Sequence, residues 1–294
     1  MMISKKDRVV KARWADDGAV TAWGGLALAE RLAHRTRLWS DGRRLLPSRT
    51  RTGAGYDSTA VLAAMIHGLL SGARGTFAAE PLREDKALGR LIGLEASVPE
   101  EATVWRALGQ WAERGGKQAL GRLQRRGCRR LIEKTPLGGM RVGGFTAVFV
   151  DGTWLEVGRE TKFEGTKVFH GAAKLRLSTL WVGPYLAGQG FAAQGQGELT
   201  TSMALIDPVW KEVIAPAGLS RSVLFLADAL YGNDTALQGF EACPGAHYVL
   251  GGGGLGRPGA RGGRATRSSM EKHRSRPSAR LGRIGAVRAR VSGR

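Results

Sequence analysis

The stretch "VFVDGTWLEV", residues 148–157, places an aspartate directly after a run of apolar residues. The apolar run begins at Phe145, and a continuous run of this kind is typical of a strand that is covered on both faces of a sheet. A second stretch, "VLFLADALYGND" at residues 223–234, ends its own apolar run at Asp228. If the two strands are neighbours, Asp151 and Asp228 converge at the same edge of the sheet.

The segments around these two runs alternate between strand and helix patterns. Further strands are expected over 167–182, near Phe191 and over 246–251, and helices over 199–215, where Pro208 is a possible interruption, and over 235–243. This order predicts an α/β fold with a mixed sheet and helices on its faces.

The part of the chain before residue 135 has a helical pattern. Helices are expected over 59–75, 82–94, 97–116 and the arginine-rich 117–134. Ser97 and Glu100 have the spacing of a capping box, which places the start of the third helix there. Residues 88–110 are compatible with a helix–turn–helix that pivots at Gly93, although two adjacent helices need not read DNA.

The chain of 294 residues carries a formal net charge of +20, and 43% of its residues are hydrophobic. Such a charge favours polyanionic partners, with nucleic acid first and an anionic membrane surface second. No run of 18 apolar residues and no signal peptide are present, which predicts a soluble cytoplasmic protein. The two cysteines lie far apart and are interpreted as reduced, buried side chains rather than metal ligands.

The amino-acid composition of the chain changes after Gly251. Residues 251–294 contain twelve Arg and Lys residues against one acidic residue, Glu271, and few large apolar side chains. Such a segment is expected to be disordered. Two interpretations stay open: a basic tail that binds DNA, or an out-of-frame translation of GC-rich DNA, which we favour. Translating the other reading frames of the encoding DNA would separate them.

The two aspartates indicate a metal site. Mg²⁺ takes oxygen ligands, commonly one or two carboxylates together with water and substrate phosphate. Two such ions activate a water or a 3′-hydroxyl in phosphodiester chemistry. The alternative is that each aspartate only begins a turn after its strand. Because two such aspartates, Asp151 and Asp228, occur together in a strongly basic chain, we favour the metal interpretation.

The stretches that carry these residues, together with "EGTKVFHGAAKLRLSTLWV" and "AGQGFAAQGQGELTTSMAL", resemble the DDE transposases of bacterial insertion sequences, of the IS4-like type and its IS1380-like branch. The resemblance covers about residues 20–250. It implies a ribonuclease H-like core and Mg²⁺-dependent (or Mn²⁺-dependent) cutting and joining of DNA. Asp151 matches the first catalytic aspartate and Asp228 the second, and both would be metal ligands.

The resemblance implies a third catalytic acid, a Glu within a Tyr–Arg–Glu–Lys spacing. No such motif is present in this sequence. This chain has no Tyr after Tyr248, and Glu271 lies in the biased tail. Glu198 and Glu241 do not occupy the position that the motif requires. The sequence therefore predicts a truncated or frameshifted copy that is inactive as written.

We therefore predict three regions in the chain: a helical DNA-binding and assembly region at 1–140, an incomplete ribonuclease H-like core at 141–250, and the tail at 251–294. Double-stranded DNA is the expected partner, as transposon end and as target, with a homodimer or larger assembly formed on it. The candidate phosphate contacts, whose alternative is a solvated surface, are Arg159, Lys162, Lys167, Lys174 and Arg176. The alternative functions are a non-catalytic protein that occupies transposon ends or inhibits an intact transposase, and a related ribonuclease H-like nuclease.

Overall fold

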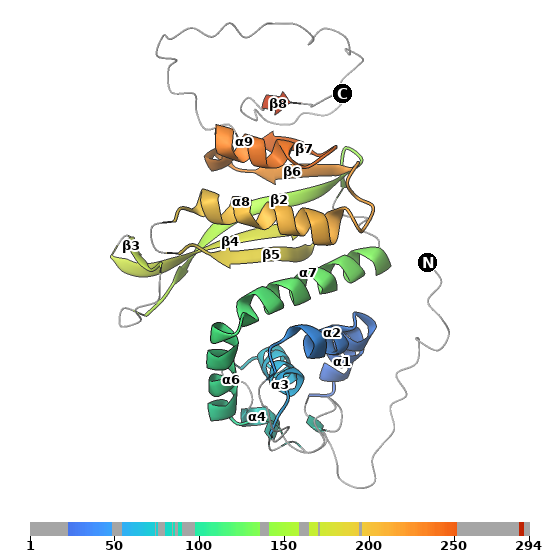
Figure 1. Ribbon diagram of the computed structural model, residues 1–294, viewed down its shortest axis with the longest axis vertical. Helices are drawn as coiled ribbons and strands as arrows, with labels where there is room; N and C mark the ends of the chain where they lie inside the picture. The colour runs from blue at the N-terminus through green and yellow to red at the C-terminus, as the bar shows by residue number, and fades with distance from the viewer. Residues whose placement is uncertain are drawn as a thin grey trace, which may run out of the picture. The chain divides into compact units, whose positions relative to one another are not determined.

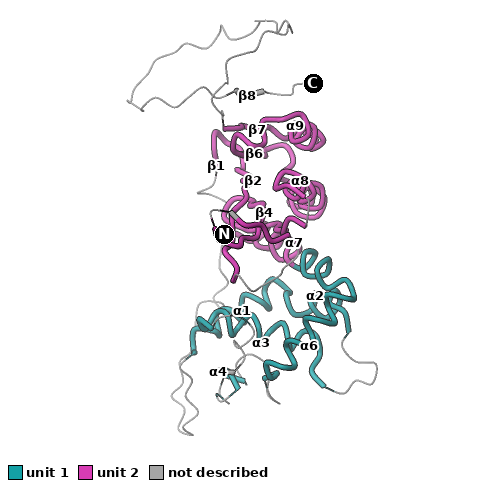
Figure 2. The backbone as a smooth tube through the Cα atoms, turned by 90° about the vertical axis from the view of Figure 1, so that its left-hand side faces the viewer, with its two compact units in different colours: residues 1–123 teal, residues 124–294 magenta. Residues whose placement is uncertain are grey.

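The computed structural model describes residues 23–48, 55–73, 75, 80–83, 85, 88–89, 98–135, 141–158, 165–169, 171–193, 196–251 and 288–290. The chain divides into two compact units, Met1–Leu123 and Gln124–Arg294. The division falls inside a helix, whereas the sequence analysis placed its boundary near residue 140, and that functional boundary stays a prediction. Figure 2 shows the two units in different colours.

Unit 1 is helical throughout its described part. Its helices are α1 (Leu26–Arg35), α2 (Leu38–Leu45), α3 (Ser58–Leu70), α4 (Glu80–Arg83), α6 (Glu101–Glu113) and the first half of α7 (Gly116–Lys134). Helix α3 begins after Asp57, whose carboxylate accepts a hydrogen bond from the amide of Ala60 at 2.6 Å. The buried face of α6 carries Val104, Ala107 and Trp111.

Two predictions for unit 1 have different outcomes. The predicted start of the third helix is wrong, because α6 begins at Glu101, and Glu100 is an N-cap residue without a side-chain capping bond. Ser97 lies outside the described residues. So does Gly93, the expected pivot of the helix–turn–helix, and that motif stays a prediction.

Unit 2 is a mixed α/β structure built on a mixed open sheet (Figure 1). The strands are β1 (Arg141–Val142), β2 (Phe145–Glu156), β3 (Lys167–Phe169), β4 (Ala172–Val182), β5 (Tyr185–Phe191), β6 (Val223–Ala227), β7 (His247–Leu250) and β8 (Arg288–Arg290). Strand β2 lies in the middle of the sheet. It pairs antiparallel with β4 and parallel with β6, while β5 pairs with β4 and β7 with β6.

Helices connect the strands at the two points where the chain crosses between parallel strands. Helix α8 (Glu198–Val209), continued by the π-helical turn η3 (Trp210–Ile214), links β5 to β6, and α9 (Asp234–Glu241) links β6 to β7. Pro208 does not end α8, since the helix continues to Val209. Figures 1 and 2 show α8 and α9 on the same side of the sheet.

The core of unit 2 lies between this helical layer and the sheet. Phe225 on β6 is fully buried, with its ring 5.0 Å from that of Phe240 and 6.4 Å from that of Trp210. Val148 and Val150 of β2 belong to the same core. The predicted mixed sheet with helices packed on it is confirmed at this level, with α8 and α9 on one face (Figures 1 and 2).

The tail is mostly outside the described residues, so its predicted disorder stays a prediction there. The exception is β8, where Arg288–Arg290 pairs antiparallel with β7. Within the described part, no helix combines the length and the apolar character that a membrane span requires.

Candidate functional site

Asp151 lies within strand β2 rather than at its end. The prediction of a strand exit there is wrong, because β2 continues to Glu156 through its pairing with β4, which runs to the pair Glu156↔Lys174. The parallel pairing of β2 with β6, however, ends at the pair Val150↔Ala227. Asp151 is therefore the first residue of β2 after its pairing with β6 ends.

Asp228 follows the last residue of β6 directly. Its carboxylate caps the short 3-10 helix η4 (Ala229–Tyr231), accepting a hydrogen bond from the amide of Leu230 at 2.9 Å. Because Val150 and Ala227 are paired in parallel strands, Asp151 and Asp228 follow them at the same edge of the sheet. The convergence that the sequence predicted is present in the register.

Both aspartates line one open pocket with a volume of about 730 Å³. Its remaining lining residues are mostly apolar: Phe149, Val150, Thr179, Trp181, Gly183, Pro184, Leu226 and Ala227. Asp151 is exposed. Its Oδ1 accepts a hydrogen bond from the Gly152 amide at 2.7 Å. Each carboxylate thus uses one oxygen to hold its own backbone, which leaves the other oxygen for a ligand in the pocket.

Both carboxylates act electrostatically on a buried phenol. The pKa of Tyr231 is raised from its ordinary value, first by burial and then by the negative charges of Asp228 and Asp151. A hydrogen bond with Ser202 and the positive charge of Arg176 oppose the rise. Tyr231 is therefore close enough to both aspartates to sense their charges.

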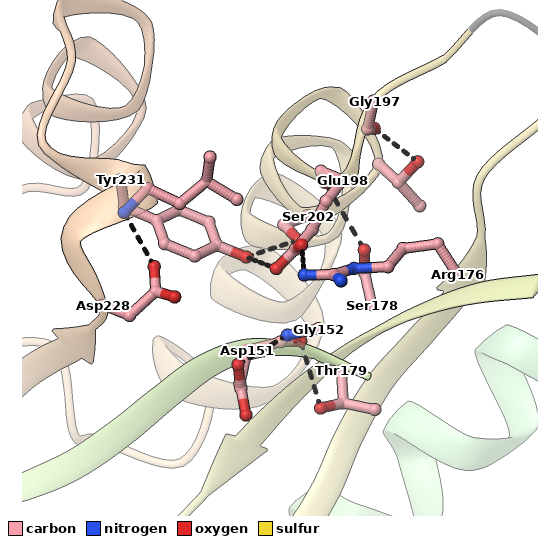
Figure 3. Close-up of polar contacts among 12 residues, drawn as sticks. Asp151, Gly152, Arg176, Ser178, Thr179, Gly197, Glu198, Ser202, Asp228 and Tyr231 are labelled. Atoms are coloured by element: carbon pink, nitrogen blue, oxygen red, sulfur yellow. Dashed lines mark hydrogen bonds and ion pairs between the residues drawn. The ribbon is translucent and has the colours of Figure 1, made fainter. Parts of the chain in front are cut away.

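A buried polar cluster that the sequence analysis missed lies beside the aspartates (Figure 3). Glu198, the first residue of α8, forms an ion pair with Arg176 and accepts a hydrogen bond from the Tyr231 hydroxyl at 3.2 Å. The side chain of Glu198 is only 6% exposed. A Cβ atom at Gly152 would collide with the Glu198 side chain, so a larger residue here would displace the Glu198 carboxylate.

Glu198 does not complete a three-carboxylate site. Its carboxylate is engaged by Arg176, and in Figure 3 the Asp151 carboxylate points away from it. The other acid considered, Glu241, accepts a hydrogen bond from the Tyr248 hydroxyl at 3.1 Å. Across the described ranges, no group of three or more His, Cys, Asp or Glu side chains is arranged to hold a metal ion. Glu271 lies outside these ranges.

The predicted phosphate contacts fall into three groups. Arg159 and Lys162 lie outside the described residues. Lys167 and Lys174 are directly opposite each other on β3 and β4. The guanidinium of Arg176 pairs with Glu198 and lies 4.8 Å from the centre of the Trp154 ring.

The cysteines behave as buried, protonated side chains. Burial raises the pKa of both Cys128 and Cys243 to about 12. We expect neither thiol to react with Ellman's reagent at pH 8 while the chain is folded, and both to react in denaturant. Unfolded thiols ionise at about pH 8.5. The stability that the two protonated, buried thiols contribute should therefore be lost as pH rises from there through about 12. Rapid labelling of the folded chain would contradict this burial.

No protein-family model matches the chain, and no curated protein is significantly similar to it.

Proposed function

We propose that the chain derives from a DDE transposase and that Asp151 and Asp228 form its divalent-cation site. The observation that carries this proposal is the pair Val150↔Ala227, after which both aspartates follow at one edge of the sheet. Two exposed carboxylate oxygens facing one open pocket fit the way proteins hold Mg²⁺, with few protein ligands and room for water and a phosphate.

The order of the strands supports a ribonuclease H-like core. Three antiparallel strands, β2, β4 and β5, are followed by two parallel strands, β6 and β7, on the other side of β2. The helical crossovers α8 and α9 separate the parallel strands in the chain. We take this order, with β2 at the centre and Asp151 and Asp228 on or directly after adjacent strands, as support for the ribonuclease H-like core that the resemblance implies.

The chemistry follows from these positions. A divalent cation held by Asp151 and Asp228 would activate a water or a 3′-hydroxyl and stabilise the leaving oxygen of a phosphodiester. Asp151 and Asp228 would hold and orient this cation, since each carboxylate is fixed by a hydrogen bond that it accepts from a backbone amide. The third acid that the resemblance implies has no counterpart in the sequence, and we therefore propose that strand cleavage is lost or severely reduced.

Neutralising either aspartate tests the site. We expect Mn²⁺ to bind the full chain, and Asp151→Asn or Asp228→Asn to weaken binding at least about tenfold, equal to about 1.4 kcal/mol. Titration followed by electron paramagnetic resonance of free Mn²⁺ measures this. Asp207→Asn is the matched control, because Asp207 is an exposed residue of α8 paired with Lys211. A chain that binds no Mn²⁺ at millimolar concentration would refute the proposal.

A non-catalytic DNA-binding protein is the second candidate. It is favoured by the net charge of +20, which suits a polyanionic partner. Binding of double-stranded DNA by an unsubstituted chain that binds no Mn²⁺ would favour this candidate over the cation site.

A further inference from the structure

We propose that Tyr231, through Glu198 and Ser202, is a positioning residue that fixes the turn after Asp228 relative to the strand that carries Asp151. This inference rests on the proposed function, because its effect is on the divalent cation that the two aspartates would hold. Tyr231 does not line the pocket.

Tyr231 ties the turn of Asp228 to helix α8. It is the last residue of η4, and its side chain is fully buried. The Tyr231 hydroxyl donates to Glu198 Oε1 at 3.2 Å and lies 2.8 Å from the Ser202 hydroxyl. The Tyr231 amide also donates to the carbonyl of Asp228 at 3.2 Å. A movement of the Asp228 turn would therefore break a buried hydrogen bond, which is costly.

Glu198 connects the same turn to the backbone beside Asp151. Its side chain occupies the space that a Cβ atom at Gly152 would take. Arg176, on the neighbouring strand β4, holds the Glu198 carboxylate from the other side. One buried carboxylate thus contacts the residue after Asp151 and the tyrosine three residues after Asp228.

The chemistry of Tyr231 suits this role. A phenol ionises only at about pH 10, so at neutral pH the Tyr231 hydroxyl keeps the proton that it donates to Glu198. A neutral donor beside Glu198 adds no charge to the pocket. Residues that orient metal ligands in this way change metal affinity by about 10- to 100-fold when they are removed.

The test is Tyr231→Phe, which keeps the ring and removes the hydroxyl. We expect the Kd for Mn²⁺ to rise about tenfold at a temperature where the variant is folded, as circular dichroism would verify. Tyr248→Phe is the matched control: Tyr248 is also buried and donates to a glutamate, Glu241, and we expect its Kd to stay within about twofold of the parent value. If Tyr231→Phe does not fold, Ser202→Ala provides the same test with a smaller expected rise.

The outcomes separate this inference from the proposed function. If the unsubstituted chain binds no Mn²⁺, the proposed function fails. If the chain binds Mn²⁺ and the folded Tyr231→Phe variant binds it equally well, the cation site stands and the positioning role is overturned. A lowered melting temperature with an unchanged Kd would show that Tyr231 has a structural role only, and would also overturn the inference.

Discussion

Replacing Arg176 by Met is expected to lower the free energy of unfolding by about 3 kcal/mol, because Glu198 would keep a buried carboxylate without its cation. The side chains of Arg176 and Glu198 are 21% and 6% exposed, so water cannot replace the lost partner. Arg176 also lies over the Trp154 ring, and the loss of that contact adds to the effect. Urea denaturation followed by circular dichroism would measure the change.

Two controls isolate the buried ion pair. Lys211→Met breaks the pair between Lys211 and Asp207, whose side chains are both 69% exposed, and we expect a loss of at most about 1 kcal/mol. The double variant Arg176→Met/Glu198→Met removes both charges and should recover most of the stability, since an uncharged pair leaves no carboxylate to desolvate. An Arg176→Met variant as stable as Lys211→Met would show that Glu198 is not held as described.

The sequence was sufficient to predict the central strands, and it placed the two aspartates at one edge on the condition that these strands are neighbours. Apolar runs such as 145–150 and 223–227 exceed what a surface segment would carry, and a carboxylate after each run was visible without a structure. Neighbouring parallel strands then bring Asp151 and Asp228 to one edge, as the pair Val150↔Ala227 confirms. The chemistry assigned to them stays a prediction.

The course of β2 beyond Asp151 was not predictable from local signals. Asp followed by Gly is typical of a turn, but here the pairing of β2 with β4 continues through both residues. A side chain at Gly152 would meet the Glu198 carboxylate instead. That contact involves a residue 46 positions later in the chain, and no local pattern reveals it.

Glu198 itself illustrates the same limit. An acidic residue at the first position of a helix is ordinary and usually solvated, so no local signal predicted the burial of Glu198. Its burial depends on Arg176 and Tyr231, which come from a strand before it and a turn after it. The contact with Gly152 next to Asp151 could be inferred only after the sheet and helix α8 were placed.

Phe225→Ala is expected to destabilise the chain by about 3–5 kcal/mol, the range for removing a buried phenyl ring. Phe225 has no exposed surface, and its ring packs against those of Phe240 on α9 and Trp210 on η3. Because β6 also carries Asp228 at its end, a cavity here should loosen the strand that presents this carboxylate. Urea denaturation would measure the loss, with Leu230→Ala as the control, since Leu230 is 46% exposed and should change stability by about 0.5 kcal/mol or less. Equal losses for the two variants would contradict the packing of β6 against α9.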